Sequence, residues 1–157
     1  MTSAVAPNAP VRHTVRLSAV ITAGDEVLVV RRPDGTWDLP GGPFPLGRSI
    51  PDAIRDLVAA DTGALVAVQG VTGIYPRHTP RLGIVCRATH ISGQIAPAQS
   101  HTVAAIWVRL PDLPAYLTAH SVVQIHDALL PQKMWPELAR PPGGSSAATT
   151  NSSGARS

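Results

Sequence analysis

Cysteine is almost absent from this sequence of 157 residues, in which Cys86 stands alone. A single cysteine excludes an intramolecular disulfide framework and a metal site built from several thiolates. The sequence also lacks an apolar run long enough to cross a bilayer. Its first ten residues have neither a basic start nor a continuous apolar segment, so they do not read as a signal peptide. We therefore expect a cytoplasmic protein that does not enter the membrane.

Lysine is equally scarce, because Lys133 is the only lysine among thirteen basic residues. The other basic residues are arginines that are scattered along the chain, and the formal net charge is +3. Domains that bind nucleic acids usually gather their basic residues on one face or along one helix. The scattered arginines therefore do not predict a nucleic-acid-binding surface.

Large apolar residues are rare at both ends of the chain. Residues 1–10 are mostly Ala, Pro and other small residues, and the C-terminal end reads PPGGSSAATTNSSGARS. Such compositions cannot bury enough apolar surface to offset the entropy cost of ordering. We predict a flexible arm over residues 1–10, one domain over residues 11–131 and a disordered tail over residues 132–157.

Alternating and β-branched residues predict strands over residues 11–23, 26–32, 65–75, 82–91 and 103–110. Gly70 and Gly73 interrupt the third of these strands and predict a bulge or bend there. A short helix or turn is expected over residues 111–117. Residues 119–130 have the apolar spacing of an amphipathic helix, which Pro131 ends.

A loop rich in glycine and proline precedes a further helix within Gly41–Ala64. Ser49 is a candidate N-cap, and Asp52 follows it by three residues in a variant capping box. Apolar residues then recur at helical spacing until Gly63, which is the residue type expected just after a helix C-terminus. We predict a helix over residues 51–62, whose N-terminal loop can present backbone N–H groups to an anion.

The same stretch resembles the Nudix box, whose pattern is GX5EX7REUXEEXGU, where U is an aliphatic residue. The pattern fits without a gap from Gly42 to Ala64, and Trp37–Gly42 (WDLPGG) matches the usual lead-in. Val27–Gly35 (VLVVRRPDG) is similar to the second strand and turn of the family. The resemblance implies an α+β Nudix fold, in which a mixed sheet is sandwiched between helices. It also implies a cleft where helix carboxylates hold Mg²⁺ or Mn²⁺ against a diphosphate.

The acidic positions of that pattern hold other residues in this chain. The first Glu is Arg48, the Arg is Asp56, the next Glu is Leu57, and the final Glu pair is Ala60 and Asp61. Leucine and alanine offer no oxygen to Mg²⁺, which requires oxygen ligands. Asp61 is therefore the remaining candidate metal ligand. We expect either no metal cofactor or only weakly bound Mg²⁺ or Mn²⁺.

No Asp or Glu occurs between Thr62 and Pro111, where Nudix enzymes often have a further glutamate. Basic and neutral polar residues in this stretch favour an anionic ligand that binds without a metal. The residues predicted to bind such a ligand are Arg32, Trp37, Gly41, Gly42, Arg48, Arg77 and Arg81. The catalytic candidates are Asp61, His78 and His101.

Three functions remain open at this point. The first is a metal-dependent Nudix pyrophosphohydrolase that cleaves compounds linked to a nucleoside diphosphate. The second, which we favour, is a Nudix domain with a degenerate box that binds a nucleotide or a phosphorylated metabolite, because Arg48 replaces an acid with a permanent cation. The third is a metal-free enzyme that uses His78 or His101 as acid or base. In all three the partner is a small anionic ligand, and the sequence leaves a homodimer open.

Overall fold

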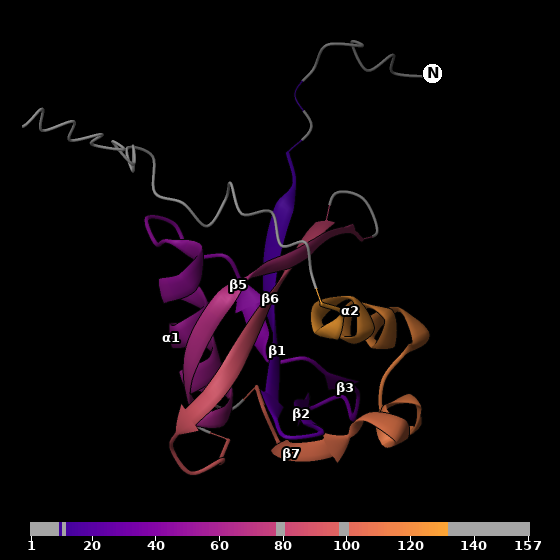
Figure 1. Ribbon diagram of the computed structural model, residues 1–157. Coiled ribbons are helices and arrows are strands. Elements are labelled where there is room, and N and C mark those ends of the chain that lie inside the picture. The colour runs from indigo at the N-terminus through magenta and orange to yellow at the C-terminus, as the bar shows by residue number, and fades with distance from the viewer. Residues whose placement is uncertain (1–9, 11, 78–80, 98–100, 132–157) are drawn as a thin grey trace, which may run out of the picture.

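The computed structural model describes residues 10, 12–77, 81–97 and 101–131 (Figure 1). The predicted arm, apart from Pro10, and the predicted tail lie outside the described residues, as does His78. No helix within the described ranges is long and apolar enough to cross a membrane.

Seven strands of the described residues form one mixed sheet. They are β1 (Thr14–Ala23), β2 (Glu26–Arg31), β3 (Trp37–Asp38), β4 (Gly41–Pro43), β5 (Leu65–Pro76), β6 (Arg81–Ser92) and β7 (Ala104–Arg109). The strand order is β3-β2-β1-β6-β5, while β4 also pairs with β1 and β7 pairs with β2. Strands β1 and β6 run parallel, and the other pairs are antiparallel.

The helical elements are α1 (Ile50–Thr62), the 3₁₀ helix η1 (Leu110–Ala115) and α2 (Ala119–Leu129). The predicted caps of α1 are confirmed, because the Ser49 hydroxyl accepts a hydrogen bond from the Asp52 N–H at 3.2 Å. Gly63 ends α1 in the left-handed conformation with φ 74°. The expected helix or turn over residues 111–117 is present as η1.

Each face of the sheet has its own core. Leu17, Ala19 and Ile21 of β1 belong to a cluster that includes Ile54 and Val58 of α1. Val20, between them in the chain, belongs to a second cluster with Ile125 and Ala128 of α2. Because successive strand residues point to opposite faces, β1 anchors both layers, and Figure 1 shows α1 and α2 on opposite sides of β1. The predicted α+β fold, with a mixed sheet between helices, is confirmed.

The two shortest strands differ from the prediction, which treated the segment before Ser49 as loop. Strand β4 pairs with β1 through Leu17 and Gly42, and a side chain at Gly41 would place its Cβ 2.0 Å from the Leu17 carbonyl oxygen. Glycine thus permits this close approach of two backbones, although glycine lowers strand propensity. The predicted irregularities of β5 are confirmed by register shifts at Gly70 and Gly73.

Candidate functional site

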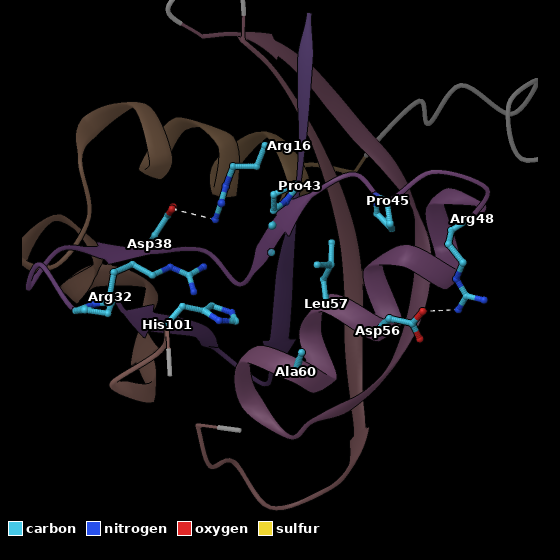
Figure 2. A pocket seen from close by; sticks show the side chains of 13 residues that line it. Arg16, Arg32, Asp38, Pro43, Pro45, Arg48, Asp56, Leu57, Ala60 and His101 are labelled. Carbon is cyan, nitrogen blue, oxygen red and sulfur yellow. Dashed lines mark hydrogen bonds and ion pairs between the residues drawn. The ribbon is translucent and has the colours of Figure 1, made fainter. Parts of the chain in front are cut away.

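A cleft of about 970 Å³ opens between the β3–β4 segment and α1 (Figure 2). Its walls are formed by β1, by the segment between β2 and α1, by α1 itself and by His101. The lining residues are Arg16, Arg32, Pro33, Asp38, Gly41, Gly42, Pro43, Pro45, Arg48, Asp56, Leu57, Ala60 and His101. The cleft therefore includes four of the five positions at which the Nudix pattern has a charged residue.

The fifth of those positions, Asp61, lies beneath the cleft and its side chain is fully buried. Arg32 donates to both carboxylate oxygens, with Nη1–Oδ1 at 2.9 Å and Nη2–Oδ2 at 3.1 Å. The Gly41 N–H donates to Oδ2 at 2.9 Å, and the Thr102 hydroxyl donates to Oδ1 at 2.8 Å. This fork-like pairing of arginine and carboxylate is among the strongest hydrogen-bond arrangements in proteins. Asp61 thus joins α1 to three separate segments of the chain.

These partners determine the ionisation of Asp61. Burial raises the pKa of Asp61, but the hydrogen bonds from Arg32, Gly41 and Thr102 together outweigh burial and hold the pKa below its ordinary value. The carboxylate is therefore ionised at neutral pH, and the charge of Arg32 compensates it.

The residues of the box do not fit a divalent metal. Arg48, Leu57 and Ala60 provide no anionic oxygen, and the Asp56 carboxylate pairs with Arg48 at the rim. Both oxygens of Asp61 already accept hydrogen bonds, so a cation at Asp61 would have to displace Arg32. Within the described ranges, no group of three or more His, Cys, Asp or Glu side chains is arranged to hold a metal ion. The weak metal site at Asp61 stays a prediction, and the buried partners of this carboxylate make it an unfavourable ligand.

His101 is the catalytic candidate that the structure brings into the cleft. Its Nε2 lies 2.8 Å from the Asp61 Oδ1, and its side chain is half-exposed. This contact with a carboxylate fixes the orientation of the imidazole. When Nε2 donates to Asp61, Nδ1 is the ring nitrogen that can accept a proton. A role of His78 cannot be placed, since His78 lies outside the described residues.

Arg48 has a partner that the sequence interpretation overlooked. Its guanidinium forms an ion pair with the Asp56 carboxylate at the rim of the cleft (Figure 2). The Nudix pattern has Glu and Arg at these two positions, so the two charges have changed places in this chain. The sequence interpretation took Arg48 as a permanent cation that attracts phosphate, and the structure adds that Asp56 balances its charge.

The other predicted ligand-binding residues divide into two groups. Arg32, Gly41 and Gly42 line the cleft, as expected of ligand-binding residues. Trp37 and Arg81 do not line it: the Trp37 ring packs edge-on against Tyr116 with centroids 5.3 Å apart, and Arg81 is an exposed residue at the start of β6.

Arg77 follows β5, and it too is absent from the lining of the cleft. Its side chain lies against Gly83, since a Cβ at Gly83 would be 3.7 Å from the Arg77 Cδ. Gly83 is the register partner of Arg16, a residue that does line the cleft. Arg77 therefore lies near Arg16 without lining the cleft, and ligand binding by Trp37, Arg77 and Arg81 stays a prediction.

Arg16 and Asp38 are site residues that the sequence interpretation missed. The Arg16 Nη2 donates to the Asp38 Oδ2 at 3.3 Å, while the Arg16 Nε is buried without a hydrogen-bond partner among the described residues. Burial lowers the pKa of Arg16 and the Asp38 carboxylate opposes that shift, yet an arginine remains charged at neutral pH. The available signal was a charged residue in the segment Val15–Ile21 of β1, which is apolar apart from Arg16 and Ser18.

No family model matches the chain. A MutT-like protein from Streptomyces ambofaciens is 28% identical over 122 residues, which cover 76% of this chain and 79% of that protein. The crystal structure of an ADP-ribose pyrophosphatase from Streptococcus suis superimposes with a TM-score of 0.66 and 27% identity, over 74% of this chain and 92% of that one. A NUDIX hydrolase from Nitrosomonas europaea gives a TM-score of 0.66 and 24% identity, over 74% and 88% of the two chains. Together with the box frame and the sheet between its two helices, these similarities identify the chain as a member of the Nudix superfamily.

Proposed function

We propose that this domain binds a nucleotide or another phosphorylated metabolite in the cleft and does so without a divalent metal. The observation that carries the proposal is the contact of Arg32 with both oxygens of Asp61. The acid that remains in the box is thereby neutralised by a permanent cation of the chain itself. In this proposal Arg32 is the counter-ion of this acid, as a metal is in a conventional Nudix site.

Arg16, on β1, supports the same proposal. Its buried Nε has a hydrogen to donate and no acceptor among the described residues. A buried donor without a partner costs about 1–3 kcal/mol, and a shift of this side chain toward a phosphate in the cleft would recover that cost. Arginine is also the residue whose planar donors match phosphate geometry best.

Calorimetry and thermal shift measurements with ADP, ADP-ribose and inorganic phosphate test this function. We expect saturable binding in EDTA, with a stabilisation that follows RT ln(1 + [L]/Kd) and does not increase when Mg²⁺ is added. Arg16→Gln should weaken binding at least tenfold. Arg55→Gln is the matched control, because Arg55 pairs with Asp52 on an exposed part of α1 and does not line the cleft.

A metal-dependent pyrophosphohydrolase is the competing function, and the Streptococcus suis relative carries the name ADP-ribose pyrophosphatase. Release of AMP from ADP-ribose by the unmodified chain at about 1 per second or faster, with Mg²⁺ required, would overturn our proposal. The companion experiment restores the family acids through Arg48→Glu, Leu57→Glu and Ala60→Glu, with Asp56→Arg as partner. We expect these changes to create Mg²⁺ binding that the parent lacks.

Metal-free acid–base catalysis is a second candidate, and one distance favours it. The 2.8 Å contact between the His101 Nε2 and Asp61 orients the ring at the cleft, so Nδ1 could accept a proton from a water molecule that attacks a phosphoryl group. This candidate requires phosphate or AMP release in EDTA. His101→Asn should then abolish release while the Kd for the ligand changes less than threefold.

A further inference from the structure

The middle of the cleft is apolar, although the family pattern puts acids there. Leu57 and Ala60 occupy two glutamate positions, and both are partly exposed to the cleft. Leu57 also packs closely on Gly42, since a Cβ on Gly42 would meet the Leu57 Cδ2 at 3.0 Å. Pro43 and Pro45 extend this apolar surface on the opposite wall. A ligand group that contacts these residues gains from burying apolar rather than charged surface.

The charged residues lie to either side of that apolar middle. In Figure 2, Arg16, Asp38, Arg32 and His101 lie on one side of Leu57 and Ala60, and the Arg48–Asp56 pair lies on the other. The cleft therefore has a charged end, which we define as Arg16, Asp38, Arg32 and His101, and an apolar middle, which we define as Leu57, Ala60, Pro43 and Pro45.

Most of the positive charge at the charged end is already compensated. Asp38 pairs with Arg16 and Asp61 pairs with Arg32. Arg77, which borders Arg16 through Gly83, has no ion-pair partner among the described residues. The two arginines that line this end are thus balanced by two aspartates, and Arg77 adds one positive charge outside the lining. A phosphate monoester, with about two negative charges at most, is therefore repelled less at this end than a diphosphate, which carries more.

We infer that the cleft prefers an organic phosphate monoester whose ester group is apolar over a diphosphate such as ADP. The phosphate lies against Arg16 and Arg32 at the charged end, and the ester group lies on the apolar middle at Leu57 and Ala60. This inference rests on the proposed function and specifies the class of ligand. Leu57 and Ala60 then bind the ester group, in addition to removing two acids that would hold a metal.

A homologous series of alkyl phosphates tests the inference on the full chain in EDTA. Calorimetry would compare inorganic phosphate, ethyl, butyl and hexyl phosphate, and ADP. Burial of one methylene is worth about 0.8 kcal/mol, which is roughly a fourfold decrease in Kd. We expect the Kd to fall about twofold to fourfold for each added methylene, and hexyl phosphate to bind more tightly than ADP.

Two neighbouring alanines of α1 provide a matched pair of variants. Ala60 lines the cleft, while Ala59 is exposed and does not. Ala60→Glu should remove the dependence of Kd on chain length and weaken hexyl phosphate at least tenfold, while Ala59→Glu should leave the Kd within twofold. Arg16→Gln should weaken every member of the series by the same factor, because it acts on the phosphate alone.

The measurements on the unmodified chain decide the inference even if a variant does not fold. A Kd that is independent of chain length, or ADP binding more tightly than hexyl phosphate, would overturn it while metal-free phosphate binding still stands. If neither inorganic phosphate nor any ester binds in EDTA, the proposed function and this inference are both overturned.

Discussion

Two arginine–aspartate pairs accompany the box helix, and they differ in burial and in the number of their partners. The side chains of Arg32 and Asp61 are 16% and 0% exposed, whereas those of Arg48 and Asp56 are 46% and 59% exposed. Asp61 also accepts hydrogen bonds from Gly41 and Thr102. An exposed pair usually contributes about 0–1 kcal/mol, whereas removing one member of a buried pair costs about 3–5 kcal/mol.

The difference teaches that a residue kept from a catalytic pattern can have become structural. Asp61 is the acid of the box that matches the family by type, yet its position under the cleft makes it the acceptor for donors from three other segments. Arg48 and Asp56 differ from the pattern at both positions, yet they still form a pair at the rim. Asp61 therefore holds the wall of the cleft in place, whereas Arg48 and Asp56 determine the charge at its rim.

The largest effect should come from Asp61→Ala. This variant leaves the Arg32 charge and the Gly41 N–H without their acceptor, so we expect the free energy of unfolding to fall by about 3–5 kcal/mol. Urea unfolding followed by circular dichroism measures this change. Asp56→Ala is the matched control at the exposed pair and should cost less than about 1 kcal/mol. Equal losses in the two variants would contradict the comparison.

Lowering the pH should remove part of the stabilisation that Asp61 provides. The pKa of Asp61 in the folded protein is lowered, with burial opposed by the bonds from Arg32, Gly41 and Thr102. A lowered folded pKa means that the stabilisation is fully present above the unfolded value of about 3.9 and is lost as the pH falls through the folded value. The stability difference between wild type and Asp61→Asn should therefore shrink below about pH 4. A difference that is constant from pH 6 to pH 3 would argue against a charged Asp61.

A smaller effect should separate arginine from lysine at the two pairs. Arg32 uses Nη1 and Nη2 together on Asp61, and Nη1 also donates to the Thr102 hydroxyl at 3.0 Å. Lysine keeps the charge but cannot reproduce this planar fork. We expect Arg32→Lys to cost about 1.5–3 kcal/mol, which is the usual range for a hydrogen bond to a charged group.

Arg48→Lys is the matched control for that change, since the Arg48–Asp56 pair is exposed and the variant retains the charge. It should change the free energy of unfolding by less than about 0.5 kcal/mol. The measurement is again urea unfolding at neutral pH. Comparable losses for the two lysine variants would show that charge alone, and not the fork geometry, stabilises the buried pair.

The fold was predictable because its signals are local and repeated. The capping residue Ser49, the stop at Gly63 and the apolar spacing between them predict α1 to within one residue of its observed bounds. The glycines of β5 likewise mark its irregularities. Strand β4 was missed because its pairing depends on the close approach of Gly41 to Leu17, 24 positions earlier in the chain, and no local pattern records such a contact.

The site was predictable only in part, because its partners are distant in sequence. Arg32, Gly41 and His101 were named as candidates, but their shared contact with Asp61 joins segments that only the folded sheet brings together. Arg16 was missed, since a single arginine in a strand is usually an exposed edge residue. The pairing of Arg48 with Asp56 was also missed, because each position was judged against the pattern separately.

The smallest effect should appear when the charges of the exposed pair are reversed. Arg48→Glu alone or Asp56→Arg alone places like charges together, and the double variant restores an ion pair in the order of the Nudix pattern. A double-mutant cycle should give a coupling free energy of about 0.2–1 kcal/mol for this pair. That coupling should nearly vanish in 1 M NaCl, where the Debye length is about 3 Å. A coupling that exceeds about 2 kcal/mol or persists in 1 M NaCl would contradict the exposed character of the pair.

The same reversal at the buried pair should fail, which sharpens the comparison further. In Arg32→Asp/Asp61→Arg the two charges are again opposite, but residue 61 would now present donors to the Gly41 N–H, which is itself a donor, whereas the Thr102 hydroxyl can also accept. The Gly41 N–H belongs to the backbone, so no side-chain exchange can turn it into an acceptor. We expect this double variant to be at least as unstable as Asp61→Ala in urea unfolding. Recovery of wild-type stability would mean that Asp61 is held by charge alone, and that its contact with Gly41 contributes little.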